Sequence, residues 1–210
     1  EQELIYTNWL HTDCISSLHQ TEIFSERYWE LIRRYISEAA VHGMNMLLTP
    51  VFTPPLDTAK GGERPTVQLV DVTVTGSGYA FGFENLEKWF RLAGICGIKY
   101  FEVSHLFTQW GAEHAPKIIG TEGGVRKKLF GWETDAAGEE YSEFLSIFLP
   151  ALTGFIRSRG LEERCFFHVS DEPSFEQIGS YSAASGIVRE FLDGYPVIDA
   201  LSDIDFYSKG

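Results

Sequence analysis

The chain has 210 residues, of which 44% are hydrophobic and only 22% are charged, a composition typical of globular proteins and not of disordered ones. Its 30 acidic residues outnumber its 17 basic ones, which gives a formal net charge of -13. Such a surface repels the phosphates of nucleic acids and of anionic membranes, so we expect neither as a partner.

No apolar run approaches the roughly 18 residues that a transmembrane helix requires, and no signal peptide opens the chain. The three cysteines, Cys14, Cys96 and Cys165, are far apart in the sequence. They lack the CxxC spacing of a zinc ribbon or a redox motif. We therefore expect reduced thiols and a cytoplasmic location.

Strand-like and helical segments alternate along the chain. Apolar residues at helical or alternating spacing predict the elements, and Gly and Pro mark their ends. Strands are expected at 3–11, 44–52, 67–83, 98–107, 164–170 and 195–202, and helices at 25–43, 84–97, 141–160 and 174–194. Ser25 is the expected N-cap of the first helix, and Gly43 its C-terminal stop.

Three segments between these elements are expected to be loops. Residues 12–25 are polar, residues 56–66 are rich in Gly, Pro and Asp, and residues 108–140 form a long Gly-rich connection. A connection as long as the last one is usually functional in a compact domain.

About six strands separated by helices are the pattern of βαβ units with a parallel sheet. A complete (β/α)8 TIM-type barrel has eight strands and usually about 250 residues. We therefore predict an α/β fold, either a (β/α)8 TIM-type barrel that is incomplete in this chain or a smaller open α/β sheet, and we favour the incomplete barrel.

Polar and aromatic residues gather where the predicted strands end. These residues are Asn8, Trp9, His11, Asp13, Asp57, His105, Gln109, Trp110, His168, Asp171, Glu172, Asp199, Ser202 and Asp203. The carboxyl ends of barrel strands meet at one face, which carries the active site. Aromatic rings that stack on sugar rings, with carboxylates and amides that bind hydroxyl groups, predict a saccharide substrate.

The stretch FFHVSDEPS, residues 166–174, places Asp171 and Glu172 side by side at the end of a strand. Neighbouring side chains in a strand point to opposite faces, so both acids can share a site only where the strand has ended. Pro173 favours an extended backbone at Glu172 and is also a good first residue of a helix. The pair can therefore be either an active site or a helix cap without chemistry.

His11 and Asp13 form an HxD pair, a spacing that can bind a metal in barrel hydrolases, with His105 or His168 completing the site. The alternative is that these are hydrogen-bonded pocket residues, which we favour. Two Gly-rich segments, 59–65 and 120–127, do not fit a phosphate-binding loop. We therefore expect neither a metal nor another cofactor.

Four segments, 47–72, 97–118, 166–174 and 197–203, resemble in order a bacterial domain related to glycoside hydrolase family 123, the β-N-acetylgalactosaminidases. SDEP is the most specific element of this resemblance. The resemblance implies that residues 1–210 form a catalytic (β/α) barrel domain. It also implies that an N-terminal β-sandwich domain and the last barrel strands lie outside this chain.

The resemblance also implies a reaction. The expected activity is a retaining, substrate-assisted exo-hydrolysis of terminal β-linked N-acetylgalactosamine, with Glu172 as general acid/base and Asp171 orienting the 2-acetamido group. Glu172 would have to stay protonated near neutral pH, and Asp171 would have to stay ionised through hydrogen bonds.

The remaining site residues are expected to bind the substrate. Trp9, Trp110 and Trp132 are predicted to form the sugar platform, and the predicted hydroxyl contacts are His11, Asp13, His105, Gln109 and His168. The alternative functions are a metal-dependent barrel hydrolase and a non-catalytic carbohydrate-binding barrel. The sequence does not predict an oligomeric state.

Overall fold

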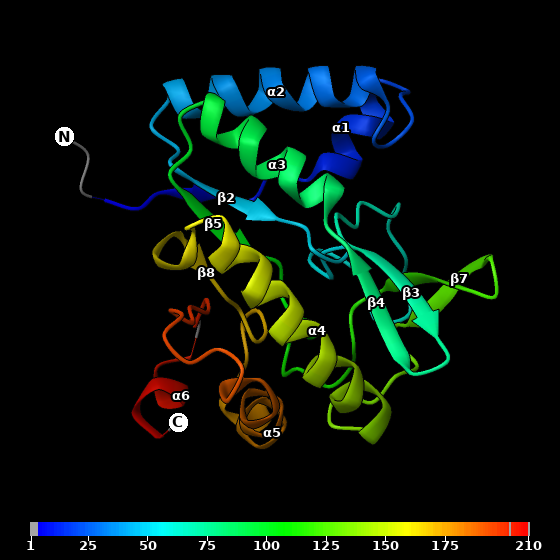
Figure 1. The fold of residues 1–210 in the computed structure, drawn as a ribbon. Helices are drawn as coiled ribbons and strands as arrows, with labels where there is room; N and C mark the ends of the chain where they lie inside the picture. Colours follow the sequence, from blue (N-terminus) through cyan, green and yellow to red (C-terminus); the bar gives the residue numbers. More distant parts are fainter. Residues whose placement is uncertain (1–3, 202, 210) are drawn as a thin grey trace.

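A computed structural model describes residues 4–201 and 203–209 (Figure 1). Four short strands form a parallel sheet in the order β1, β2, β5, β8. Their bounds are β1 (Thr7–Asn8), β2 (Met46–Thr49), β5 (Tyr100–Val103) and β8 (Cys165–Phe166). A parallel bridge between Phe167 and Val197 continues the sheet beyond β8. Its five segments therefore lie side by side in chain order.

A second sheet consists of two hairpins. Its strands are β3 (Asp71–Thr75), β4 (Gly78–Gly82), β6 (Ile118–Glu122) and β7 (Val125–Phe130). They lie in the order β4, β3, β6, β7, with antiparallel pairs within each hairpin and a parallel pair between β3 and β6. Figure 1 shows β3, β4 and β7 to one side of the parallel sheet.

This second sheet corrects two expectations. Within residues 67–83 the sequence predicts a turn at GSG, and this turn is confirmed. It folds the segment into the antiparallel β3–β4 hairpin, so the segment is not a strand of the parallel sheet as expected. Gly78 takes φ +125° there, a conformation that favours glycine. Residues 108–140 are not one long loop, because they contain the β6–β7 hairpin, whose turn includes Gly123 and Gly124.

Six α-helices and two short 3-10 helices are present among the described residues. Their bounds are α1 (Thr12–Leu18), α2 (Glu26–Val41), α3 (Glu84–Ile95), α4 (Glu139–Ser158), α5 (Ile178–Arg189), α6 (Ile204–Lys209), η1 (Glu162–Arg164) and η2 (Phe175–Gln177). The predicted caps of α2 are confirmed: the Ser25 hydroxyl accepts the Tyr28 N–H at 3.2 Å, and Gly43 takes φ +96° after the helix.

Helix α1 lies in a segment that was expected to be a loop. The four residues that it buries are Thr12, Asp13, Ile15 and Ser16. Only one of these is apolar, so the helix has no periodic hydrophobic stripe that the sequence could display.

The two faces of the parallel sheet differ in chemistry. Leu47, Phe101 and Phe167 belong to the main core, and Phe101 packs against Phe90 of α3 with ring centroids 4.5 Å apart. Cross-strand pairing places Leu48 beside Glu102, on the opposite face. We call that opposite face the inner face. It carries the polar groups described below.

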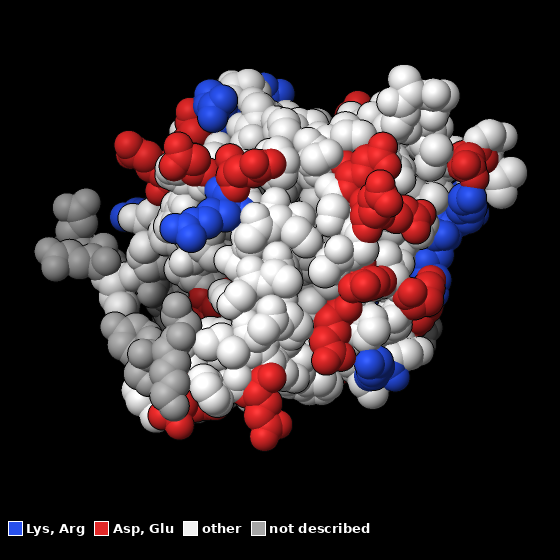
Figure 2. Space-filling view, turned by 90° about the horizontal axis from the view of Figure 1, so that it is seen from below, with Lys and Arg blue, Asp and Glu red and all other residues white. Residues whose placement is uncertain are grey.

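The predicted α/β class is confirmed, whereas a closed TIM barrel is not observed in the described part of the chain: the parallel sheet is open between β1 and the segment at Val197. Figure 2 shows scattered clusters of acidic side chains on the face seen there, with fewer basic ones, in keeping with the net charge of -13. Within 4–201 and 203–209, no helix is long and apolar enough to cross a membrane.

Candidate active site

Asp171 and Glu172 lie in the loop that leaves the parallel sheet after β8. The Asp171 carbonyl oxygen accepts the Trp110 N–H at 2.8 Å, and the Glu172 N–H donates to the Ala200 carbonyl at 3.2 Å. Backbone hydrogen bonds thus fix the pair between two loops from neighbouring sheet segments. Asp171 is buried, with 8% of its surface exposed, whereas Glu172 is exposed.

The helix-cap interpretation of this pair is wrong. The N-cap residue is Ser174, which precedes η2 and α5, and its N–H donates to the Gln177 side chain at 3.0 Å. Glu172 is also not extended as Pro173 suggested. It takes φ +45°, in the left-handed region, which is uncommon for a residue with a Cβ. Such strained backbone is often found at functional sites.

A buried network of charged groups lies on the inner face next to this loop. His168 has one ring nitrogen, Nε2, 2.6 Å from Oε1 of Glu102 and the other, Nδ1, 3.1 Å from Oδ1 of Asp199. The side chains of all three are 4% exposed or less. Tyr181 of α5 donates to the remaining Asp199 oxygen. The three residues come from β5, from the end of β8 and from the segment after Val197.

The network determines the charge of its members. Burial alone would lower the pKa of His168, but its hydrogen bonds to Asp199 and Glu102 raise it to about 9. Burial alone would raise the pKa of Glu102, but hydrogen bonds from His168, Thr7 and Trp9 hold it below its usual range. At neutral pH, His168 is therefore an imidazolium between carboxylates.

Asp171 responds to this charge. Burial and the neighbouring Glu172 carboxylate raise its pKa to about 6, while the charge of His168 acts in the opposite direction. Asp171 is thus ionised at neutral pH and becomes protonated in mild acid. We expected hydrogen bonds to keep it ionised. In the described residues no hydrogen bond to its carboxylate is found, and the His168 charge favours the ionised form instead.

Trp9 and His105 complete the inner face. The Trp9 indole N–H donates to Glu102 Oε1 at 2.7 Å, and its ring meets His105 edge-on at 5.6 Å. His105 is fully buried and stacks on His168 with centroids 4.1 Å apart. Among the residues that the structure describes, neither of its ring nitrogens has a hydrogen-bond partner. Burial and the His168 charge lower its pKa well below the usual value, so it is neutral.

His105, His168 and Asp199 have ligand atoms within 4.8 Å of one another, but their arrangement suits a proton better than a metal ion. A metal bound by an imidazole lies near the plane of the ring. The two rings are stacked at an interplanar angle of 27°, so they cannot readily direct a nitrogen each to one ion. Both His168 nitrogens are also bound to carboxylates.

The predicted metal pair His11 and Asp13 is divided between two partners. His11 Nε2 lies 3.3 Å from Asp57 Oδ2, and Asp13 makes a two-pronged ion pair with Arg64 at 2.9 and 3.0 Å. Burial and the nearby Arg64 charge lower the pKa of His11, against the effects of Asp13 and Asp57. The two side chains therefore serve separate contacts, which does not support a shared metal.

Gln109 and the two remaining tryptophans contact loops. Gln109 accepts the Asp57 N–H at 3.1 Å and donates to the Thr58 carbonyl at 3.0 Å. Trp132 donates its indole N–H to the Gly62 carbonyl at 2.8 Å. Trp110 is 49% exposed and takes φ +60° next to the paired acids, so it presents an aromatic ring to solvent beside them.

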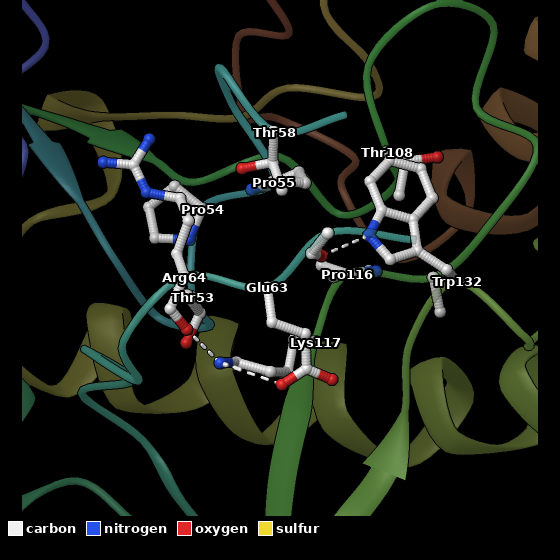
Figure 3. A pocket seen from close by; sticks show the side chains of 12 residues that line it. Thr53, Pro54, Pro55, Thr58, Glu63, Arg64, Thr108, Pro116, Lys117 and Trp132 are labelled. Atoms are coloured by element: carbon white, nitrogen blue, oxygen red, sulfur yellow. Dashed lines mark hydrogen bonds and ion pairs between the residues drawn. The ribbon is translucent and has the colours of Figure 1, made fainter. Parts of the chain in front are cut away.

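Two hollows differ in size and lining. One of about 590 Å³ lies between β1 and the segment after Val197; among its lining residues are Trp9, His11, Glu102, His168 and Asp199. This volume is in the range of small-molecule pockets. The other holds about 20 Å³, enough for about one water molecule. Figure 3 shows Trp132 across this smaller hollow from Pro55 and Thr58.

The tryptophans therefore do not form one platform. Trp9 lines the larger hollow and Trp132 the smaller one, while Trp110 lines neither. The site also contains Glu102, which sequence reasoning missed, and Asp199, which was named among the strand-end residues but given no role. The signal for Glu102 was an acid inside the apolar strand 98–107, because acids are almost never fully buried unless they are paired.

In a comparison with family models, the model of the glycoside hydrolase 123 catalytic domain matches residues 9–210. The match begins just after β1 (Thr7–Asn8) and includes every other strand of both sheets, the paired acids and the His168 network. A comparison with curated proteins finds no match.

Proposed function

The chain belongs to glycoside hydrolase family 123, and we propose that it is a retaining exo-glycosidase that releases terminal β-linked N-acetylgalactosamine with the help of the substrate's own acetamido group. Membership in the family means that it is a glycoside hydrolase. The sugar, the stereochemical course and the roles of the residues are our proposal.

The proposed reaction has two steps. The acetamido carbonyl oxygen attacks the anomeric carbon, and the glycosidic oxygen leaves with a proton from Glu172. Water then attacks the same carbon, giving its proton to Glu172, and the oxazoline-type ring opens with the original configuration restored. Asp171 accepts a hydrogen bond from the acetamido N–H, which orients the attacking oxygen.

The observation that carries the proposal is the different surroundings of the two adjacent acids. Two carboxyl groups that act as acid and nucleophile stand about 5 Å apart on either side of the bond. Substrate assistance removes the need for an enzymic nucleophile, so neighbours in sequence can serve. Buried Asp171 is ionised at neutral pH, as the orienting role requires. Glu172 is exposed, so it lacks the partial burial expected of a general acid and has instead the neighbouring Asp171 carboxylate beside it.

The larger hollow has room for a sugar-sized ligand. Asp171 and Glu172 are not among its lining residues, but Ala200, whose carbonyl accepts the Glu172 N–H, is. Trp9 offers a ring for stacking at the wall of this hollow, and His11 is half-buried at the same hollow. Trp110 offers a second exposed ring beside the acids. We retain Trp9, His11 and Trp110 as proposed substrate contacts. Asp13, His105, Gln109, Trp132 and His168 have structural partners, and we propose that they act by holding the site.

We also propose that the parallel sheet is part of a (β/α)8 barrel. Five parallel segments in chain order, open at both edges, support it. Strands outside residues 1–210 would close the barrel, and a β-sandwich domain would precede it. The reaction as proposed uses no cofactor.

An activity screen tests the proposal. Aryl glycosides of β-GalNAc, β-GlcNAc and β-Gal are compared, and we expect turnover of the first, weaker turnover of the second and none of the third. A thiazoline analogue of the bicyclic intermediate should inhibit. Turnover of β-Gal equal to that of β-GalNAc would contradict acetamido assistance.

Two variants and one control assign the roles. Glu172→Gln should lower kcat by about 10² to 10⁴-fold, the usual contribution of general acid catalysis, whereas Glu176→Gln, which changes an exposed acid nearby, should leave it unchanged. Asp171→Asn should impair 2-acetamido substrates, and wild-type activity should fall as the pH drops through about 6, where Asp171 becomes protonated. Full activity of Asp171→Asn would show the mechanism to be wrong.

A further inference from the structure

We propose that Glu102 is a positioning residue of the active site: its carboxylate holds the Trp9 indole and the His168 imidazolium in one hydrogen-bonded unit, which fixes an aromatic wall and a positive charge beside Asp171. The role assigned to the unit rests on the proposed function. The unit itself can be tested without any substrate.

Glu102 has the contacts that this role requires. Its Oε1 accepts the Trp9 N–H at 2.7 Å and lies 2.6 Å from His168 Nε2, while its Oε2 accepts the Thr7 hydroxyl at 2.6 Å. It is 1% exposed. A buried carboxylate with three donors has little freedom to move, so the two rings that share Oε1 keep a fixed relation to each other.

The charge of His168 depends on its surroundings on every side. Glu102 on β5 and Asp199 on the last sheet segment contact its two nitrogens, and Tyr181 on α5 donates to Asp199. His105 lies against the ring face and is neutral. Asp171, three residues ahead in the chain, interacts with the charge of His168. Acids thus contact both nitrogens of the imidazolium.

The charge of His168 matters because Asp171 needs it. Burial and Glu172 both favour protonated Asp171, and His168 opposes them. Removing the negative charge of Glu102 would weaken the hold on the His168 proton, so the pKa of His168 would fall and that of Asp171 would rise. Glu102 therefore affects the reaction through His168 and Asp171, while its contact with Trp9 affects substrate binding.

Titration of His168, followed by nuclear magnetic resonance of ring-labelled histidine, tests the unit directly. In the wild type we expect a midpoint near 9. In Glu102→Gln, which preserves shape but removes charge, the midpoint should fall by about 1–3 units. Glu87→Gln changes an exposed acid of α3 paired with Arg159, and it should leave the His168 midpoint in place.

Kinetics distinguish positioning from folding. In Glu102→Gln the acidic limb of the kcat/KM profile should move to higher pH, because Asp171 is protonated more easily. Trp9→Phe replaces the indole by a smaller ring without an N–H group, which weakens stacking on the sugar. KM should therefore rise, while the midpoint of the His168 titration stays unchanged. A purely structural role of Glu102 would lower kcat/KM at all pH values alike.

A wild-type His168 midpoint near 6.5, or a midpoint that Glu102→Gln does not move, would overturn the proposal. If Glu102→Gln does not fold, the wild-type titration and the Trp9→Phe kinetics decide. Because the titration needs no turnover, a protein that cleaves no 2-acetamido sugar would refute the proposed function, while the His168 midpoints would still decide on Glu102.

Discussion

The inner face of the parallel sheet and the loop around the smaller hollow both pair acids with bases, but at different depths. On the inner face, Glu102 and Asp199 enclose His168 with side chains 2–4% exposed. At the loop, Asp13 pairs with Arg64 at 7% and 15% exposure, and Lys117 lies 3.8 Å from Glu63, which is 53% exposed. Water therefore screens the charges of the loop pairs more than the charges of the inner-face network.

The difference in depth indicates a difference in role. A buried charge acts strongly on its neighbours because little solvent screens it, so the inner face can set the ionisation of Asp171. The ion pairs at the loop affect only the groups that they contact. Arg64 also donates to the Leu56 carbonyl at 2.8 Å, and Lys117 donates to the Arg64 carbonyl (Figure 3), so these bases hold the shape of the 53–66 loop.

The largest expected loss of stability comes from removing a charge on the inner face. Glu102→Ala should lower the free energy of unfolding by about 3–5 kcal/mol, because it leaves His168 with one acid fewer in a buried site. Urea denaturation measures this. The exposed control Glu87→Ala breaks a pair with Arg159 and should cost about 0.2–1 kcal/mol. If Glu102→Ala and Glu87→Ala lowered the free energy of unfolding equally, burial would not distinguish the inner-face network from exposed ion pairs.

The second effect concerns pH. The pKa of His168 is raised from 6.5 to about 9 on folding, so the native state binds this proton more tightly than the unfolded state. The stabilisation is fully present below pH 6.5 and is lost as the pH rises through about 9, a change on the order of 3 kcal/mol. Unfolding measured from pH 6 to 10 should show this decline, and His168→Gln should not. A wild-type protein equally stable at both ends of this range would contradict a buried imidazolium.

Breaking an ion pair at the loop should lower the free energy of unfolding less than breaking one on the inner face. Arg64→Met should cost about 1.5–3 kcal/mol, since it removes charged hydrogen bonds from buried Asp13 while preserving side-chain length. Arg27→Met, which breaks an exposed pair with Glu30 on α2, serves as the control at about 0.2–1 kcal/mol. If Arg64→Met lowered the free energy of unfolding as much as Glu102→Ala does, the burial of the inner-face network would not make its contacts stronger than those of the loop.

The smallest effect is expected at Trp132. Trp132→Phe removes the hydrogen bond to the Gly62 carbonyl and should cost about 0.5–1.5 kcal/mol. Because Trp132 lines the smaller hollow and not the larger one, KM for the aryl glycoside should stay unchanged. A several-fold rise in KM would instead place Trp132 in the sugar site.

The fold was predictable where one rule governs a segment. Helix α2, with its Ser25 cap, and the parallel strands follow from periodicity and end signals. The β3–β4 and β6–β7 hairpins were missed as a sheet because their pairing brings together residues about 50 positions apart, which no local pattern encodes. Helix α1 was missed because it buries a polar face.

The candidate site was predictable as a set of residue types at strand ends, but the hydrogen-bond partners of these residues were not. His11 and Asp13 are two residues apart, yet they pair with Asp57 and Arg64. His168 was expected to contact a sugar, but both its nitrogens are bound to acids from other segments. Such pairings depend on the tertiary arrangement, which spacing alone does not determine.

In the proposed reaction, the substrate's acetamido oxygen is the nucleophile, and it attacks beside Asp171 and Glu172. The most direct test compares aryl β-GalNAc substrates whose acetyl group carries no, one, two or three fluorine atoms. Fluorine withdraws electrons from the carbonyl oxygen and weakens its attack, so we predict that kcat falls steeply with each fluorine. A kcat independent of fluorination would contradict substrate assistance.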